Sequence, residues 1–162
     1  IWGGGLEKAQ EIVKRMEPLL NGVQVSQAAD ALPAALKAFG VKKKISVVTP
    51  YFPVAEPHIQ QFAADIGYEI VKTYHMSCKS PTLIAHTNED QCWEALRSVD
   101  SNEVEAIIQF GANLPFAAVA AEAEKRLKKP IVAVNVATVW HALRSFGIHD
   151  RIYGQGRLLW EY

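Results

Sequence analysis

The sequence has little cysteine and no excess of charge of either sign. Its 162 residues include only two cysteines, Cys78 and Cys92, and 17 basic residues balance 17 acidic ones. So few cysteines argue against a disulfide framework and favour a reduced, cytoplasmic protein. The charge balance argues against a chain built around nucleic acid or an anionic membrane surface.

Long apolar runs are missing as well. No segment approaches the ~18 consecutive apolar residues of a membrane span. No basic stretch precedes Ile1-Trp2-Gly3, as it would in a signal peptide. The chain opens instead on two residues typical of the end of a buried strand. We therefore expect a further N-terminal segment in the natural protein, and neither a membrane nor a nucleic acid as its partner.

What the sequence does have is a regular alternation of helical segments and short apolar runs. Apolar residues at helical spacing predict a helix over 6–20 and a second one that ends at Gly40, joined by a short strand or extended link at 23–25. Beyond Lys42 the predicted strands are 45–49, 68–74, 106–110 and 130–134, and the predicted helices are 59–66, 88–99, 114–127 and 137–146. This alternation predicts an α/β fold with a parallel sheet that is covered on both faces.

Parallel sheets bind ligands at the carboxyl ends of their strands, often where the strand order reverses. The candidate substrate-binding residues are therefore those just after each predicted strand: Gly3, Gly4, Gly5, Thr49, Pro50, Tyr51, Gly111, Ala112, Asn113 and Asn135. Glycines and helix N-termini offer backbone N–H groups to an anion, and hydroxyl groups hold a carboxylate or polarise a carbonyl. The same glycines also fit tight turns, and Asn113 and Asn135 also fit helix caps.

The candidate acid–base groups gather in the loop after the second of these strands. His75 and His86 flank Cys78 there, and histidine titrates near neutral pH. Cys78 is either a reactive thiol or an incidental one. Tyr51, His75 and Cys78 are the candidate catalytic residues, whereas Cys92 is predicted to lie in the core. Neither a metal site nor a cofactor site is predicted.

In their order along the chain, these motifs resemble the Asp/Glu racemase superfamily, and within it the arylmalonate decarboxylase and maleate cis–trans isomerase branch. The resembling segments run from Val25 to the C-terminus and include Gln27-Ala28-Ala29-Asp30-Ala31-Leu32, Val48-Thr49-Pro50-Tyr51, Gly111-Ala112-Asn113-Leu114, Lys129-Pro130-Ile131-Val132, Trp140-His141-Ala142-Leu143-Arg144 and Tyr153-Gly154-Gln155-Gly156-Arg157-Leu158-Leu159.

The resemblance implies two pseudo-symmetric α/β lobes that face each other across the site. Residues 1–40 plus 134–162 would form a first, incomplete lobe, and residues 42–133 the second. It also implies a cofactor-independent enzyme that holds a small dicarboxylate through N–H and hydroxyl groups and stabilises an enediolate, while a cysteine thiol moves a proton or adds to the double bond. The family's two cysteine positions correspond here to Gly3 and Gly111, and glycine can be neither nucleophile nor proton donor.

Three functions stay open on the sequence. The first is a decarboxylase, isomerase or racemase that acts on a small carboxylic acid, with proton delivery by Tyr51, His75, Cys78 or a residue of the expected N-terminal segment. The second is a non-catalytic carboxylate-binding or regulatory protein that has lost the thiols. The third is a nucleotide-binding module, which the lack of a phosphate fingerprint disfavours. The sequence does not decide between a monomer and a homo-oligomer.

Overall fold

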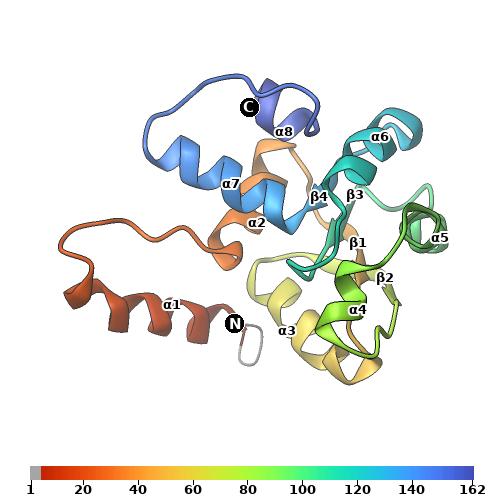
Figure 1. Ribbon diagram of the computed structural model, residues 1–162, viewed down its shortest axis with the longest axis horizontal. Helices are drawn as coiled ribbons and strands as arrows, with labels where there is room; N and C mark the ends of the chain where they lie inside the picture. Colours follow the sequence, from red (N-terminus) through yellow and green to blue (C-terminus); the bar gives the residue numbers. More distant parts are fainter. Residues whose placement is uncertain (1–4) are drawn as a thin grey trace.

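The computed structural model describes residues 5–162, which form one four-stranded sheet flanked by helices (Figure 1). In chain order the elements are α1 (Gly5–Met16), η1 (Glu17–Leu19), α2 (Ala28–Ala38), β1 (Lys44–Thr49), η2 (Pro53–Ala55), α3 (Glu56–Asp65), β2 (Glu69–His75), α4 (Pro81–Ala85), α5 (Glu89–Val99), β3 (Ala106–Gln109), α6 (Ala117–Leu127), β4 (Ile131–Ala133), α7 (Val134–Ser145) and α8 (Arg157–Glu161). The strand predicted at Ile1-Trp2, together with Gly3 and Gly4, lies outside the described residues.

All strands are parallel and follow the order β2-β1-β3-β4. The α/β class with a parallel sheet is thereby confirmed. The strand order reverses between β1 and β3, because β2 joins one side of β1 and β3 joins the other. Sheets of this kind bind ligands outside the carboxyl ends of the strands at such a switch point. The structure therefore directs attention to the loops that follow Thr49 and Gln109.

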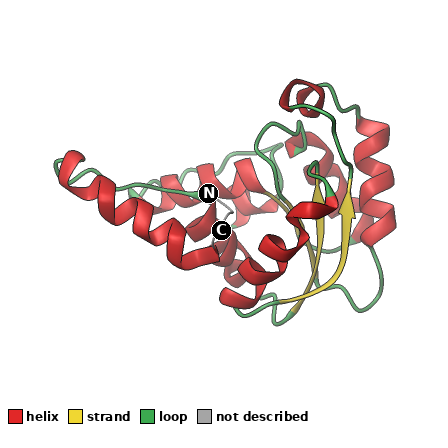
Figure 2. Ribbon diagram, turned by 90° about the horizontal axis from the view of Figure 1, so that it is seen from below, coloured by secondary structure: helices red, strands yellow, loops and turns green. Residues whose placement is uncertain are grey.

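Both faces of the sheet are buried, as the apolar strand sequences predict. On β1, Ile45 and Val47 belong to a core shared with α2, α3, α7 and α8, whereas Val48 belongs to a second core shared with α5 and α6. This alternation follows from the two-residue period of a strand. Figure 2 shows helices on both sides of the strands. The division into two lobes stays a prediction.

The N-terminal helix differs from the prediction. Its apolar spacing predicted one helix over 6–20, whereas α1 ends at Met16 and the 3-10 turn η1 continues to Leu19, before Asn21 with its left-handed φ of 47°. Ala9 is buried, whereas Leu19 is 81% exposed and Ile12 and Met16 are also exposed. The reason is that α1 packs against α3 and extends to one side of the molecule (Figure 2).

Three further features complete the fold. The link at 23–25 contains no strand, so of the two predictions for it the extended link holds. The short helices α4 and α8 were not predicted. Within residues 5–162, every helix is too short or too polar to cross a membrane.

Candidate active site

The loop after β1 is held firmly on its β2 side. The carbonyl groups of Thr49 and Pro50 accept hydrogen bonds from the N–H groups of Met76 (2.8 Å) and Cys78 (2.9 Å). The fully buried Thr49 hydroxyl accepts a hydrogen bond from the Tyr51 N–H at 3.3 Å. Thr49 therefore shapes the turn that presents Tyr51, rather than facing open space itself.

The loop after β3 lies directly against Pro50 and Tyr51. Gly111 has a φ of +99°, which side chains rarely adopt, and a Cβ atom placed on it would lie 2.5 Å from Cγ of Pro50 and 3.7 Å from the Tyr51 hydroxyl oxygen. The structure thus brings together Pro50, Tyr51 and Gly111, which the sequence had predicted from separate strand ends. It also shows that only glycine fits at position 111 without rearrangement.

Side-chain amides turn the carbonyl groups of this loop toward the protein. The buried Gln109 amide donates to the Phe110 carbonyl (2.6 Å) and the Gly111 carbonyl (2.8 Å). The Asn135 amide donates to the Ala112 carbonyl at 2.9 Å. In a trans peptide the N–H group points in the opposite direction to the preceding carbonyl. The N–H groups of Ala112 and Asn113 therefore point away from the Gln109 and Asn135 amides.

Those two N–H groups are available to a ligand. Among residues 5–162 neither the Ala112 N–H nor the Asn113 N–H donates to an acceptor, and both residues are exposed. Successive free N–H groups form a concavity that suits an anion. The Tyr51 hydroxyl lies close to Gly111, next to them in the chain, and these donors together suit a carboxylate.

The two asparagines do not cap helices, contrary to one prediction. Helix α6 begins after Phe116 and α7 after Ala133, both without a side-chain cap. The Asn113 amide instead donates to the Pro81 carbonyl at 3.3 Å, and Asn135 braces the loop as described. Asn113 therefore ties the loop after β3 to the start of α4, and Asn135 ties the same loop to the start of α7.

Gln109 is a site residue that sequence reasoning missed, and its replacement tests the bracing. We expect Gln109→Met to lower the free energy of unfolding by about 1–3 kcal/mol, because the buried Phe110 carbonyl loses its side-chain donor and the Gly111 carbonyl keeps only the Leu114 N–H. The exposed Gln155→Met substitution should have almost no effect. Urea unfolding of both variants measures the difference, and equal stabilities would show that the Gln109 amide does not brace the loop.

The two other candidate catalytic residues lie behind Tyr51. Nδ1 of His75 is 3.3 Å from the Tyr51 carbonyl oxygen, and Nε2 is 2.8 Å from Oε2 of Glu56. Cys78 is half-buried, with its sulfur 3.8 Å from the Thr87 hydroxyl. It lines a mainly apolar groove of about 400 Å³ with Tyr51. Both His75 and Cys78 are thus close to the Tyr51 loop, but on the side away from Gly111.

Cys92 lies in the core, as predicted. It lies on α5, and its side chain is fully buried in the core between this helix, α6 and the sheet. Burial, and then the charge of Glu89, raises the pKa of its thiol to about 11. The thiol is therefore protonated at neutral pH, and it takes no part in the site.

Gly5 lies against α3. A Cβ atom on Gly5 would collide with the Asp65 carboxylate, and the Leu6 N–H donates to that carboxylate at 2.9 Å. The Leu6 N–H group at the start of α1 therefore already binds a carboxylate, that of Asp65 on α3. That Gly3, Gly4 and Gly5 form part of the carboxylate site stays a prediction.

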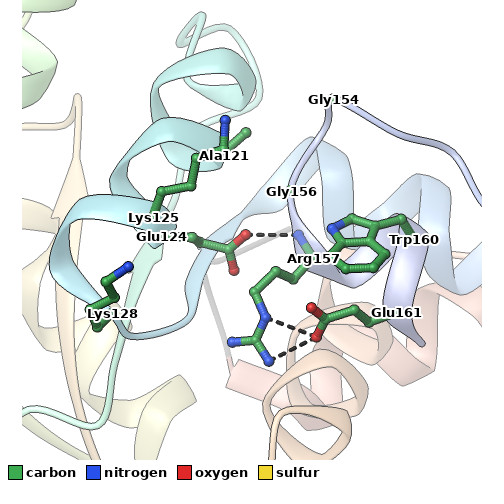
Figure 3. A pocket seen from close by; sticks show the side chains of 9 residues that line it. All are labelled: Ala121, Glu124, Lys125, Lys128, Gly154, Gly156, Arg157, Trp160 and Glu161. Carbon is green, nitrogen blue, oxygen red and sulfur yellow. Dashed lines mark hydrogen bonds and ion pairs between the residues drawn. The ribbon is translucent and has the colours of Figure 1, made fainter.

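A second pocket lies at the opposite end of the sheet, and it is structural. Figure 3 shows this pocket of about 440 Å³ between α6 and α8. Its Glu124 carboxylate is 6% exposed and accepts hydrogen bonds from the N–H groups of Ile131, at the start of β4, and Arg157, at the start of α8. Glu124 therefore ties the C-terminal segment to the sheet, far from the strand ends where Tyr51 lies. Within residues 5–162, no three His, Cys, Asp or Glu side chains gather as a metal site requires.

Comparisons with known proteins identify the family. The family model of arylmalonate decarboxylase matches residues 4–159. The chain belongs to the arylmalonate decarboxylase family. The maleate isomerase of Alcaligenes faecalis is 25% identical over 142 residues, which cover 86% of this chain and 56% of the relative. That of Nocardia farcinica (strain IFM 10152) is 28% identical over 137 residues, which cover 83% and 54%.

A solved structure extends the likeness to the fold. A variant of the maleate cis–trans isomerase of Nocardia farcinica, which carries a covalently bound succinylcysteine intermediate, matches with a TM-score of 0.91 at 23% identity, over 100% of this chain and 68% of the other. The chain spans about half the length of the curated relatives it matches. In this member of the arylmalonate decarboxylase family, the correspondence of Gly111 to the family's second cysteine position stays a prediction; at Gly111, Pro50 fills the space of a side chain.

Proposed function

We propose that this chain binds a small carboxylic acid at the carboxyl ends of β1 and β3 and takes part in an isomerase- or decarboxylase-type reaction through an enediolate-like intermediate. The observation that carries the proposal is the Tyr51 hydroxyl beside the Gly111 backbone, at the switch point of the sheet. The relatives, which are named maleate isomerases, and the family's own name support the same class of reaction.

The chemistry needs hydrogen-bond donors aimed at carboxylate oxygens. When CO₂ or a proton leaves the carbon next to a carboxylate, negative charge collects on the two oxygens of the resulting enediolate. The N–H groups of Ala112 and Asn113 and the Tyr51 hydroxyl are donors of this kind. Burial raises the pKa of Tyr51, so its hydroxyl keeps its proton at neutral pH and remains a donor.

Proton delivery has to come from a side chain other than residue 111. Gly111 carries no acid, and both ring nitrogens of His75 already face protein acceptors. The Tyr51 hydroxyl lies nearest to the position that a side chain of residue 111 would take. We therefore assign proton delivery to Tyr51, with Cys78, on the other side of the Tyr51 loop, as the alternative donor.

Tyr51→Phe tests this assignment. We expect kcat to fall roughly 100- to 1,000-fold, because the enediolate loses one preorganised donor. The full-length protein should be assayed with panels of malonates, maleate and amino acids. The exposed Tyr153→Phe substitution is the matched control and should leave the rate unchanged. An unchanged kcat in Tyr51→Phe would contradict the proposed role of this hydroxyl.

A second candidate is a carboxylate-binding or regulatory protein without catalysis. It is favoured by Gly111, whose backbone conformation and contact with Pro50 leave no room for a thiol. In that case acids from the same panels should raise the melting temperature of the full-length protein without forming product, and Tyr51→Phe should reduce the shift. If no small acid stabilises the protein, this candidate fails as well.

A further inference from the structure

His75 and Glu56, which lie behind Tyr51, have a role that rests on the proposed function but can be tested separately from it. We propose that His75 and Glu56 are positioning residues: the His75 ring holds the main-chain carbonyl of Tyr51, and the Glu56 carboxylate holds the ring. The pair thereby directs the Tyr51 hydroxyl toward Gly111 and does not touch the ligand itself.

The ring of His75 is engaged at both nitrogens. Nδ1 faces the Tyr51 carbonyl oxygen at 3.3 Å, and Nε2 faces Oε2 of Glu56 at 2.8 Å. Carbonyl and carboxylate oxygens are acceptors only, so each ring nitrogen faces an acceptor that belongs to the protein itself. Neither nitrogen is left to exchange a proton with a ligand. This geometry suits a clamp better than the acid–base role predicted from the sequence.

Glu56 is itself held from three sides. It is the first residue of α3, where the helix dipole favours an acidic side chain. Its Oε1 accepts hydrogen bonds from the Gln60 amide (2.6 Å) and the Thr73 hydroxyl (3.0 Å). Burial works against the charged carboxylate, but the hydrogen bonds from Gln60, His75 and Thr73 outweigh it and lower the pKa of Glu56. The carboxylate is therefore a charged, oriented anchor for the ring.

The clamp acts on Tyr51 through the main chain. His75 ends β2 and lies in register with Thr49, the last residue of β1. The Thr49 and Pro50 carbonyls are already bonded to the chain that follows β2, and the His75 contact extends this to the Tyr51 carbonyl. Because that contact fixes the peptide plane after Tyr51, it restricts the direction of the Tyr51 side chain.

Two substitutions at His75 separate its two contacts. In His75→Asn the amide nitrogen lies near the place of Nδ1 and keeps a donor for Tyr51, whereas in His75→Gln it lies near the place of Nε2 and keeps a donor for Glu56. The full-length protein is labelled with fluorotyrosine, and Tyr51→Phe identifies the Tyr51 signal among those of the five tyrosines. His86→Gln, on the exposed His86, is the control.

We expect the Tyr51 fluorine resonance to shift or broaden in His75→Gln and in Glu56→Ala, with smaller changes in His75→Asn and Glu56→Gln and none in His86→Gln. The signals of the other tyrosines should stay in place. An unchanged Tyr51 signal in both His75→Gln and Glu56→Ala would overturn the proposal. Equal displacement of all tyrosine signals would overturn it too, since His75 would then hold the fold in general.

Kinetic measurements on the same variants distinguish the positioning role of His75 and Glu56 from the proposed function. Where an acid is turned over, kcat should fall about 10- to 100-fold in His75→Gln with little change in KM, because a misplaced hydroxyl weakens the transition state more than ground-state binding. A displaced Tyr51 signal in a protein that neither binds nor converts any acid would refute the proposed function and leave the clamp standing. A full rate in His75→Gln would overturn the clamp alone.

Discussion

Gly111→Ala is expected to lower the free energy of unfolding by about 2–5 kcal/mol. The residue has a φ of +99°, and its added Cβ would lie 2.5 Å and 2.7 Å from two carbon atoms of the Pro50 ring. A non-glycine residue in such a conformation costs about 1–3 kcal/mol, and forcing an atom into filled space costs a similar amount. Urea unfolding of the variant and the parent measures the sum.

The two contributions can be separated with a matched glycine. Gly67 has a φ of +86° and no atom within 4 Å of an added Cβ, so Gly67→Ala reports the conformational cost alone. The double substitution Pro50→Ala/Gly111→Ala should regain part of the loss, with a coupling energy of about 1 kcal/mol or more. If Gly67→Ala and Gly111→Ala cost the same and the double variant regains nothing, Pro50 does not press on position 111.

The loop around Gly111 has no room for a thiol either. A cysteine at position 111 would carry the same Cβ as alanine and meet the same ring. Gly111→Cys alone should therefore be unstable, and a thiol becomes compatible with the loop only when Pro50 is also reduced in size. Both the φ of Gly111 and its contact with Pro50 thus suit a residue without a side chain.

The sequence predicted the sheet well, because its strands are short β-branched runs bounded by proline or glycine. The run that ends at Thr49 before Pro50, for example, is β1 to within one residue. The short helices α4 and α8 were missed because one turn is too short to show a helical period. The exposure of Ile12 and Met16 on α1 could not be predicted, because apolar spacing alone does not tell whether a partner lies opposite the helix.

The positions of the site loops could be predicted, because they follow from the parallel sheet. The individual side-chain contacts within the site could not. Neighbouring parallel strands end at the same edge of a sheet. From the sequence one could therefore expect Tyr51 to lie near Gly111 and Asn135 to lie near Ala112. The roles of Gln109, Glu56 and His75 depend on which side chains meet after folding. Gln109 did leave a signal, since a polar residue inside a buried strand needs partners. Glu56, on an ordinary helix start, left none.

Glu124→Ala is the other substitution with a large expected effect, about 2–4 kcal/mol of destabilisation. The carboxylate accepts hydrogen bonds from the Arg157 N–H (2.8 Å) and the Ile131 N–H (3.4 Å), and its removal leaves the Ile131 N–H buried and the Arg157 N–H part-buried without acceptors. Gly156, with a φ of +93°, lets the chain pass close to this carboxylate (Figure 3). Urea unfolding should show the loss, whereas Glu122→Ala, two residues earlier and half-exposed, should cost less than about 0.5 kcal/mol.

The pH dependence of the same position distinguishes a buried acid from a mere hydrogen-bond acceptor. Burial raises the pKa of Glu124 in the folded protein above its ordinary 4.5. The folded state therefore holds this proton after the unfolded state has released it, so the stability that Glu124 contributes is complete below pH 4.5 and declines as the pH rises above it. Glu124→Gln cannot ionise and lacks this decline. The stability of the parent relative to Glu124→Gln should thus be highest near pH 4 and fall toward pH 7. A difference that stays constant, or grows, over this range would show that the carboxylate is already charged and solvated in the folded chain.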